Sequence, residues 1–596
     1  MTTGVRGGPR LLLGLATVAV AFAAADTYVV VLALPDMMDS VGIPLDELQR
    51  GAPIVSGFLL GYVAMLPLIG RISDLRGRLP VLVASLVLFA TGSLVTSVAY
   101  DLSSLVVGRF LQGVGGGGLV PATLALVADL YPVHRRGVPL GVVSAVQELG
   151  SVIGPLYGAL ILAVSDWRVI FVVNPVVAVA LAVALRWLRF GAKRQEFAQK
   201  TCGLAPIHRA TTPPDWVGLG CAGVFLVAAG LVVWQPTRMV IDVTWGQLFI
   251  PVWGDGRWLT PLGLAAMVAA VGFSARCLTA RRPLVDLRGW WAAARDADLA
   301  GAAYLAVALG GVILAFATAD PRVEVFAPRG WWYLLLAGLA TIALVWHLRT
   351  ASTPLVPRGA LGRRPAWGAL AVSFFVGAAL VAALIDIPIF ARTTVYSESQ
   401  VLAALVLVRF LVALPVGAVA GGYLTRTVHP GAVAAIGMAL ASAGFALMCR
   451  WDLTSLSSWT ATVPLLVGGL GFGLALAPVN ATVLAATEPG VHGLAGAGVV
   501  VARMMGMLVG ISALTTLGLR HYYQRTSDLP PPLKVCGGAT TRCDAFDRLL
   551  QEAGIAQEHT VFAGAAVLAL VAAALALVLF RGVDVRALPS RPWVNP

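Results

Sequence analysis

The chain has 596 residues, of which 58% are apolar and only 12% are charged. An ordinary soluble domain is about half apolar and about a quarter charged, so this composition excludes a soluble protein. The net charge of +13 would suit nucleic acid or an anionic lipid surface, and in a chain this apolar the lipid surface is the better interpretation. We therefore expect an integral membrane protein with no nucleic-acid partner.

Nearly uncharged runs of residues recur along the whole chain. A bilayer core about 30 Å thick needs roughly 20 apolar residues for each helical crossing. Sixteen runs meet this length, with fourteen as the alternative count: 11–35, 51–69, 80–99, 103–128, 138–164, 168–185, 216–234, 258–275, 299–318, 331–348, 366–390, 400–424, 431–448, 460–486, 493–518 and 560–580. The sequence thus predicts an all-α polytopic membrane protein.

The loops between these runs predict the orientation in the membrane. An even number of crossings puts both termini on one side, and the loops on that side carry about twice as many lysines and arginines as the others. Both termini are therefore predicted to be cytoplasmic in a multi-pass cell-membrane protein. The first run could instead be a cleaved signal peptide, because Arg6 and Arg10 precede it, but it continues to Pro35 and is too long for a signal core.

The runs fall into two blocks of six with an insertion between them. The predicted parts are an N-terminal bundle (1–190), a central linker (191–365) with two transmembrane hairpins (216–275 and 299–348), a C-terminal bundle (366–581) with a long outer loop (519–558), and a cytoplasmic tail (582–596). The two hairpins end in similar segments, Pro283-Leu284-Val285 and Pro354-Leu355-Val356, which suggests one hairpin copied twice.

The loop after the second run has the pattern G-x-x-x-D-x-x-G-R, from Gly70 to Arg78. Asp74 and the arginines can pair with neighbouring helix ends, while Gly70 and Gly77 allow a tight turn at the membrane face. We expect these residues to form a cytoplasmic latch that holds one conformation. A generic positively charged loop would explain the arginines but not the spacing of the glycines and the aspartate.

The run 103–128 contains Arg109 and Gln112 in the pattern R-x-x-Q-G-x-G. An arginine near the bilayer centre costs about 3 kcal/mol, so it must face a partner or water. Two roles stay open for Arg109: a structural bond to neighbouring helices and a part in proton movement.

The run 138–164 contains the pattern G-x-x-x-G-P-x-x-G-G, formed by Gly150, Gly154, Pro155 and Gly158, with Ala159 in place of the last glycine. Small residues let helices approach closely, and a proline lets a helix bend. We expect this helix to be closely packed and bendable where two halves of the protein rock.

Four further ionisable residues well inside the runs are functional candidates, because burying a charge without a partner is costly: Asp26, Glu148, Arg409 and Arg503. Their positions along the runs put Asp26 level with Arg409 and Glu148 level with Arg503. We expect Glu148 or Asp26 to pair with Arg409 when deprotonated and to release it when protonated. A static salt bridge is the alternative, and Asp386 is expected near the outer interface.

Cys536 and Cys543 share the predicted outer loop, where an oxidising exterior permits a disulfide. Their spacing has no metal-site partner nearby, so no metal is expected. The chain also lacks a G-x-x-x-x-G-K-[ST] phosphate loop, so we expect no cofactor and no direct use of ATP.

Together these motifs resemble those of the major facilitator superfamily, in its branch of drug:proton antiporters with extra central helices. The resemblance implies two six-helix bundles, four additional central helices and proton coupling. The first run resembles the branch's L-D-x-T-V-V-N-V-A-L-P stretch at Asp26, but Tyr28 and Val31 replace two polar residues, which suggests a more lipophilic substrate. This stretch and residues 147–150 look most like those of mycobacterial triacylglyceride and multidrug exporters, which work with a lipoprotein partner.

We therefore expect a proton-coupled exporter of lipid or lipophilic drug that works by alternating access and is not an enzyme. The expected partners are the substrate, protons, the bilayer and an extracytoplasmic lipoprotein. A proton-coupled importer is the alternative, which the glycine-proline pattern at 150–159 disfavours. A membrane enzyme acting on lipid carriers would need acidic or histidine clusters at a loop face, where the sequence offers only scattered residues.

Overall fold

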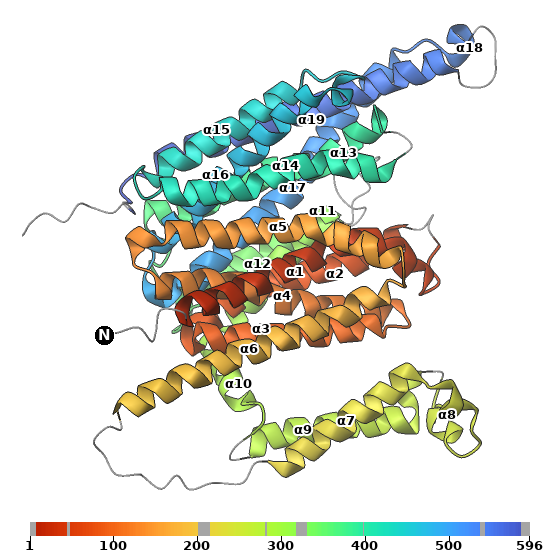
Figure 1. The fold of residues 1–596 in the computed structure, drawn as a ribbon, viewed down its shortest axis with the longest axis vertical. Helices are drawn as coiled ribbons and strands as arrows, with labels where there is room; N and C mark the ends of the chain where they lie inside the picture. Colours follow the sequence, from red (N-terminus) through yellow and green to blue (C-terminus); the bar gives the residue numbers. More distant parts are fainter. Residues whose placement is uncertain are drawn as a thin grey trace, which may run out of the picture. The chain divides into compact units, whose positions relative to one another are not determined.

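The computed structural model describes residues 8–44, 48–200, 215–254, 256–280, 283–317, 330–396, 399–536, 543–583 and 585. Each of the sixteen apolar runs forms a helix, and the described residues contain no strand (Figure 1). Fourteen described helices are long and apolar enough to cross a membrane, and the two remaining runs form α5 and α7, of 26 and 19 residues. The all-α polytopic fold is thus confirmed. Most of the predicted tail, 586–596, lies outside the described residues.

Two six-helix bundles make up most of the described chain. The N-terminal bundle consists of α1 (Gly8–Asp39), α2 (Leu48–Arg76), α3 (Arg78–Ser97), α4 (Leu102–Leu130), α5 (Gly137–Leu162) and α6 (Arg168–Lys200). The C-terminal bundle consists of α13 (Arg364–Thr393), α14 (Gln400–Leu424), α15 (Pro430–Met448), α16 (Thr462–Ala486), α17 (His492–Ser527) and α19 (Asp544–Leu579). Below, the end of the bundles where α1 begins and α19 ends is called the termini end.

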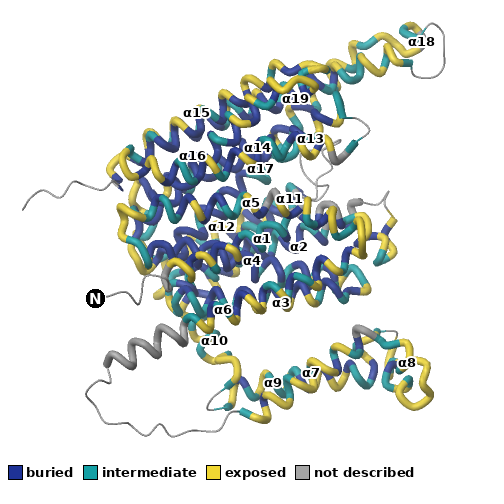
Figure 2. Tube along the Cα trace, viewed as in Figure 1, coloured by how far each residue is buried: buried dark blue, intermediate teal, exposed yellow. Residues whose placement is uncertain are grey.

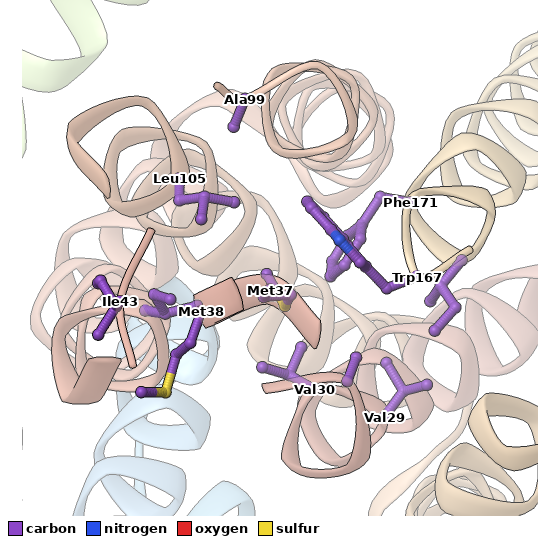
Figure 3. Packing of buried hydrophobic residues seen from close by; sticks show 12 residues of the cluster. Val29, Val30, Met37, Met38, Ile43, Ala99, Leu105, Trp167 and Phe171 are labelled. Carbon is purple, nitrogen blue, oxygen red and sulfur yellow. The ribbon is translucent and has the colours of Figure 1, made fainter. Parts of the chain in front are cut away.

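The two bundles meet along two helix pairs. Helix α5 packs against α14, and α2 packs against α17. Buried residues concentrate in the helices of these bundles (Figure 2). At the end opposite the termini end, one apolar cluster joins α1, α2, α4 and α6 around Met37, Trp167 and Phe171 (Figure 3).

The first inserted hairpin belongs to a separate compact unit, Gly191–Ala297. This unit holds α7 (Trp216–Trp234), α8 (Thr237–Ile241), α9 (Pro261–Thr279) and α10 (Leu287–Asp296). Asp215 caps α7 by accepting from the N–H of Gly218, and it also accepts from Nη2 of Arg276 on α9 at 2.7 Å. The Arg276 hydrogen bond is the main cause that lowers the pKa of Asp215, so this carboxylate stays charged and ties α7 to α9.

The second inserted hairpin, α11 (Leu299–Ala317) and α12 (Gly330–Thr350), belongs to the same compact unit as the bundles. Helix α11 packs against α2 and also contacts α17. These two helices form one of the two pairs at which the bundles meet. The two inserted hairpins, whose similar ends suggest one hairpin copied twice, thus belong to different compact units.

A single carboxylate fixes the base of the second hairpin. Asp298 is 7% exposed, has a φ of 69°, and caps α11 by accepting from the N–H of Gly301 at 2.9 Å. The same side chain contacts Nε2 of His347 on α12 at 2.8 Å and accepts from the N–H of Leu355 at 2.9 Å. One aspartate thus joins the start of α11 to the end of α12 and to the segment that follows.

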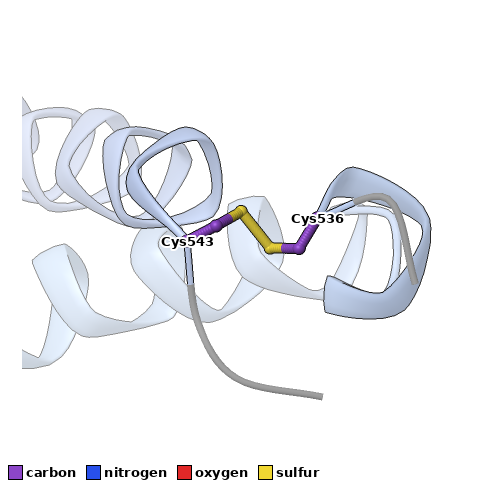
Figure 4. The surroundings of a disulfide bond; sticks show 2 residues. All are labelled: Cys536 and Cys543. Carbon is purple, nitrogen blue, oxygen red and sulfur yellow. A yellow bond between two sulfur atoms is a disulfide. The ribbon is translucent and has the colours of Figure 1, made fainter. Parts of the chain in front are cut away.

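The predicted outer loop 519–558 is largely helical. Helix α17 continues to Ser527, α18 spans Pro532–Val535 and α19 begins at Asp544. Charged residues end an apolar run in the sequence, but arginine and glutamate are good helix formers, so both helices continue beyond their apolar parts. The Cys536–Cys543 disulfide links the residue after α18 to the residue before α19, with the two Cα atoms 5.8 Å apart (Figure 4).

We predict that Asp298→Asn lowers the free energy of unfolding by about 1–3 kcal/mol, because an amide nitrogen cannot accept the bonds that the carboxylate oxygens accept. Asparagine tolerates a positive φ, so the backbone is not the cause of the loss. Thermal unfolding of the purified protein measures the effect, with Asp296→Asn at an exposed neighbouring position as the control. Equal stability of the two variants would show that Asp298 does not hold the hairpin.

Candidate functional site

Asp74 connects the two bundles at the termini end. It lies in the last turn of α2 and accepts from the N–H groups of Gly493 at 2.7 Å and Leu494 at 3.0 Å, in the first turn of α17. These N–H groups have no partner within their own helix, and a helix N-terminus favours a negative charge. Asp74 also pairs with Arg78, whose Nε donates to Asp129 at 3.2 Å.

The glycines of this latch allow the backbones of α2 and α17 to touch. A Cβ atom on Gly70 would lie 2.6 Å from the carbonyl oxygen of Gly493, and one on Gly493 would lie 2.4 Å from that of Gly70. Gly77 has a φ of 94°, which allows the sharp turn from α2 into α3. Nη1 of Arg71 adds a bond to the carbonyl of Gly490 at 3.0 Å. The residues Gly70, Asp74, Gly77 and Arg78, here called the latch, thus lie together where α2 meets α17.

A second ion pair lies entirely within the N-terminal bundle. Nη1 of Arg109 on α4 lies 2.9 Å from Oδ2 of Asp26 on α1, and both side chains are 1% exposed. Asn174 on α6 donates to the other oxygen of Asp26. Arg109 also donates to Gln112, which donates to Ser93 on α3 at 2.8 Å. The partner of Arg109 is therefore a carboxylate, and the network joins α1, α3, α4 and α6.

Aromatic and apolar side chains surround this ion pair. The guanidinium carbon of Arg109 lies 4.3 Å from the ring centre of Phe58 and 5.7 Å from that of Phe171. Such contacts with ring faces stabilise a cation more when water is excluded. The apolar cluster of Figure 3 continues along α1 from Val29, three residues beyond Asp26.

A third ion pair joins the two bundles. Nη1 of Arg503 on α17 lies 3.5 Å from Oε1 of Glu148 on α5, and the side chains are 10% and 12% exposed. The distance is long for a hydrogen bond between charged groups, which are usually about 2.7–2.9 Å apart. The pair is thus a loose contact across the seam between the bundles.

Glu148 and Arg503 border a cavity of about 240 Å³. The cavity lies between the bundles and is lined by residues of α1, α2, α5, α13 and α17. Apart from the ion pair, Thr27, Tyr62 and Gln147, its lining residues are apolar: Ala24, Val55, Phe58, Leu59, Val63, Leu380, Val381, Met504, Met507, Leu508 and Ile511.

Neither of the two acids expected to pair with Arg409 does so in the structure. Nη1 of Arg409 donates to Oγ1 of Thr462 at 3.2 Å, within the C-terminal bundle, while Asp26 pairs with Arg109 and Glu148 with Arg503. Helix α5 does pack against α14, but counting residues along a run gives only the depth of a side chain. The direction in which the side chain points around its helix decides its partner.

The glycine pattern of α5 packs against α1, inside one bundle. Cβ atoms on Gly150 and Gly154 would lie 2.2 Å and 2.3 Å from the carbonyl oxygens of Ala21 and Ala25. Gly158 likewise faces Val29 one turn further on, while the side chain of Pro155 lies outside the described residues. The pattern therefore joins two helices in register and does not lie between the halves that were expected to rock.

Two buried polar residues, Ser93 and Glu558, could not be recognised as such from the sequence. Ser93 gives no pattern signal, because serine is common in membrane helices. Glu558 is 1% exposed but lies just before the last apolar run, inside the predicted outer loop 519–558. Among the described residues, no group of three or more histidine, cysteine, aspartate or glutamate side chains could hold a metal ion.

Comparisons with known proteins agree with this architecture. The family model described as Major Facilitator Superfamily matches residues 16–352. The chain is 32% identical over 590 residues to the triacylglyceride transporter of Mycolicibacterium smegmatis, covering 96% of this chain and 88% of that protein. It is also 32% identical to the triacylglyceride transporter of Mycobacterium tuberculosis strain H37Rv, covering 96% and 95% of the two chains.

Among solved structures, the fold is similar to that of the human organic anion transporter MFSD10. The TM-score is 0.51, with 14% sequence identity, and the match covers 95% of this chain and 99% of the other. At this identity the likeness concerns the fold alone.

We predict that Gly493→Ala weakens the latch, because its Cβ would meet the backbone of Gly70 and push α2 away from α17. Distances between spin labels at the termini ends of α2 and α17 should become longer and more broadly distributed. Gly498→Ala is the matched control, since its Cβ would meet only the side chain of Leu370 at 3.5 Å. Unchanged distances in Gly493→Ala would contradict the role of this close approach.

Replacing Arg109 with Met should destabilise the protein by about 3–5 kcal/mol, because it leaves Asp26 as a buried charge without its partner. The double variant Asp26→Asn with Arg109→Met removes both charges and should recover part of this loss. Thermal unfolding of the wild type, both single variants and the double variant gives the four free energies of a double-mutant cycle. Additive effects in this cycle would show that the two side chains do not interact.

Proposed function

We propose that this chain, which belongs to the major facilitator superfamily, exports a lipid or another lipophilic molecule across the cell membrane in exchange for protons. The observation that carries this proposal is the apolar cavity between the two bundles, which has one ion pair, Glu148 with Arg503, at its border. Such a cavity suits a substrate with hydrocarbon chains, and the Glu148 carboxylate of the ion pair is a group that a proton can neutralise.

The lining of the cavity favours acyl chains over a charged drug. Most lining residues are aliphatic or aromatic, and Met504 and Met507 add flexible side chains that adapt to different shapes. Triacylglyceride is the substrate in the names of the two mycobacterial relatives, and we extend this substrate class to the present chain. A volume of about 240 Å³ is below the range of about 300–1,000 Å³ for drug-sized ligands, so the cavity must widen to hold a whole lipid.

Proton coupling in this proposal acts through Glu148. When Glu148 is ionised, its attraction to Arg503 holds α5 and α17 together across the seam. Protonation removes the negative charge and with it the attraction, so the two bundles can separate at this level. The seam then opens or closes according to whether Glu148 carries a proton, which is a population shift between two conformations.

In this proposal, the latch controls the other movement of an alternating-access cycle, the opening and closing of the bundles at the termini end. Asp74 holds α2 against the first turn of α17 at the termini end, and Gly137 of α5 lies against Gly422 of α14 at the same end. Both seams between the bundles are therefore in backbone contact there. We propose that breaking these contacts opens the cavity towards the cytoplasm, where both termini are predicted to lie, and that reforming them releases the substrate outward.

The remaining partners follow from the resemblance. The relevant bilayer is the inner or plasma membrane, and an extracytoplasmic lipoprotein would receive the lipid. Export of drugs, and hence multidrug resistance, would use the same apolar cavity.

We predict that Glu148→Gln lowers proton-driven lipid export by about tenfold or more, equivalent to about 1.4 kcal/mol in the activation free energy. The reason is that glutamine cannot exchange a proton. The assay follows a fluorescent triacylglyceride in proteoliposomes with an imposed pH gradient.

Glu552→Gln is the matched control, because Glu552 is an exposed glutamate on α19, away from the cavity. Export by Glu148→Gln at the wild-type rate, and with the wild-type response to the gradient, would exclude Glu148 as the coupling group. A failure of the wild-type protein to move the lipid, together with transport of a small lipophilic cation, would change the substrate class but keep the mechanism.

A further inference from the structure

A small pocket adjoins the apolar cavity between the bundles. Its volume is about 10 Å³, which is about enough for one water molecule. Residues of α4 and α5 line it from the N-terminal bundle, and residues of α13, α16 and α17 line it from the C-terminal bundle. Gln147 and Arg503 line both spaces, so the pocket meets the cavity at these two side chains.

The pocket is more polar than the cavity. Its polar lining residues are Ser144, Gln147, Ser373, Asn480 and Arg503. Each of these side chains can donate a hydrogen bond. Ser373 already donates to the carbonyl of a residue on α17 at 2.8 Å, so the other four are the donors that a ligand in the pocket could use.

Asn480 has hydrogen-bonding capacity that the protein does not use. Its side chain is buried and carries two N–H groups and a carbonyl oxygen. Among the described residues it has one hydrogen-bond partner, since Nδ2 donates to Oγ of Ser144 at 3.4 Å. This distance is longer than the usual range of about 2.7–3.2 Å, so the contact is weak. Asn480 on α16 thus reaches towards α5 across the seam with one N–H and its carbonyl oxygen left for a ligand.

The pocket lies on the side of the cavity that faces the termini end. Helix α17 begins at the termini end, and its residues Val499 and Val500 line the pocket. Met507 and Ile511, further along the same helix, line the cavity, and Arg503 lies between the two groups. The combined space is therefore polar at one end and apolar at the other.

We infer that the pocket binds a carboxylic ester group of the transported lipid while the hydrocarbon chains occupy the cavity. This inference rests on the proposed transport of lipid. An ester carbonyl oxygen accepts hydrogen bonds and takes up no more space than a water molecule, and Asn480, Gln147 and Arg503 line the pocket as donors. The lipid is thereby oriented with its ester end towards the termini end and its chains away from it.

The charge of the pocket favours an uncharged lipid over a phospholipid. Among the described residues that line the pocket, Arg503 alone is charged, and it already contacts Glu148. A phosphate group would enter without a cation of its own, and burying a charge in this way is costly. An uncharged ester loses only its hydrogen bonds to water, which the donors of the pocket replace.

Competition binding to the purified full-length protein in detergent tests the inference. Radiolabelled trioleoylglycerol is displaced either by the unlabelled triester or by the trioleyl ether of glycerol, which has the same chains but lacks the carbonyl oxygens. The wild type should bind the triester about three to ten times more tightly than the triether, the ratio that one hydrogen bond gives. Asn480→Leu and Gln147→Leu should each bring this ratio closer to one.

Met507→Leu, in the apolar part of the cavity, is the matched control. It should change the affinity for both lipids by the same factor and so keep the ratio. Because both affinities are measured on the same preparation, the ratio does not depend on how much of a variant is folded. The leucine substitutions also replace an amide with an apolar group of similar size, so the packing is kept.

Equal affinity of the wild type for the triester and the triether would overturn the inference, and so would a wild-type ratio in both Asn480→Leu and Gln147→Leu. Displacement of the triester by dioleoylphosphatidylglycerol with equal affinity would overturn the preference for an uncharged lipid. If the wild type binds neither the triester nor the triether, the proposed lipid substrate fails and the ester site with it. Binding of both lipids without a preference overturns the ester site alone.

Discussion

The cost of burying a charge without a partner determines which side chains pair in the interior of this protein. In low-dielectric surroundings an ionised side chain needs an opposite charge or several hydrogen bonds, and the described acids and arginines of the bundle interiors largely follow this rule. Asp26 has Arg109 and Asn174, Glu148 has Arg503, and Asp74 has Arg78 and a helix N-terminus.

These interactions differ in their surroundings, and the difference suggests different roles. The Asp26–Arg109 pair is enclosed by one bundle and held by neighbouring polar groups, so it fixes the packing of four helices. The Glu148–Arg503 pair is longer, lies between bundles and borders a cavity, so it can change without unfolding either bundle. A transporter needs both kinds of contact: rigid bundles and a seam that can open.

The sequence was sufficient to predict the helices, and it singled out the residues Gly70 to Arg78, which the structure places where α2 meets α17. Sixteen apolar runs become helices because a span has a minimum length, and the latch is visible because its glycines and charges have a fixed spacing. The partner of each buried charge could not be predicted, since depth along a run says nothing about rotation around the helix, as Arg409 shows. The burial of Glu558 could not be predicted because nearby charges end the apolar run while the helix continues.

The glycine contacts between α1 and α5 have a mechanical consequence. Gly150, Gly154 and Gly158 repeat every four residues and place the backbone of α5 directly on that of α1. Neither helix can slide along the other without steric collision, so the two behave as one rigid rod. Asp26 and Glu148 lie on this rod, and any displacement of α5 at the seam is transmitted to the buried network around Arg109.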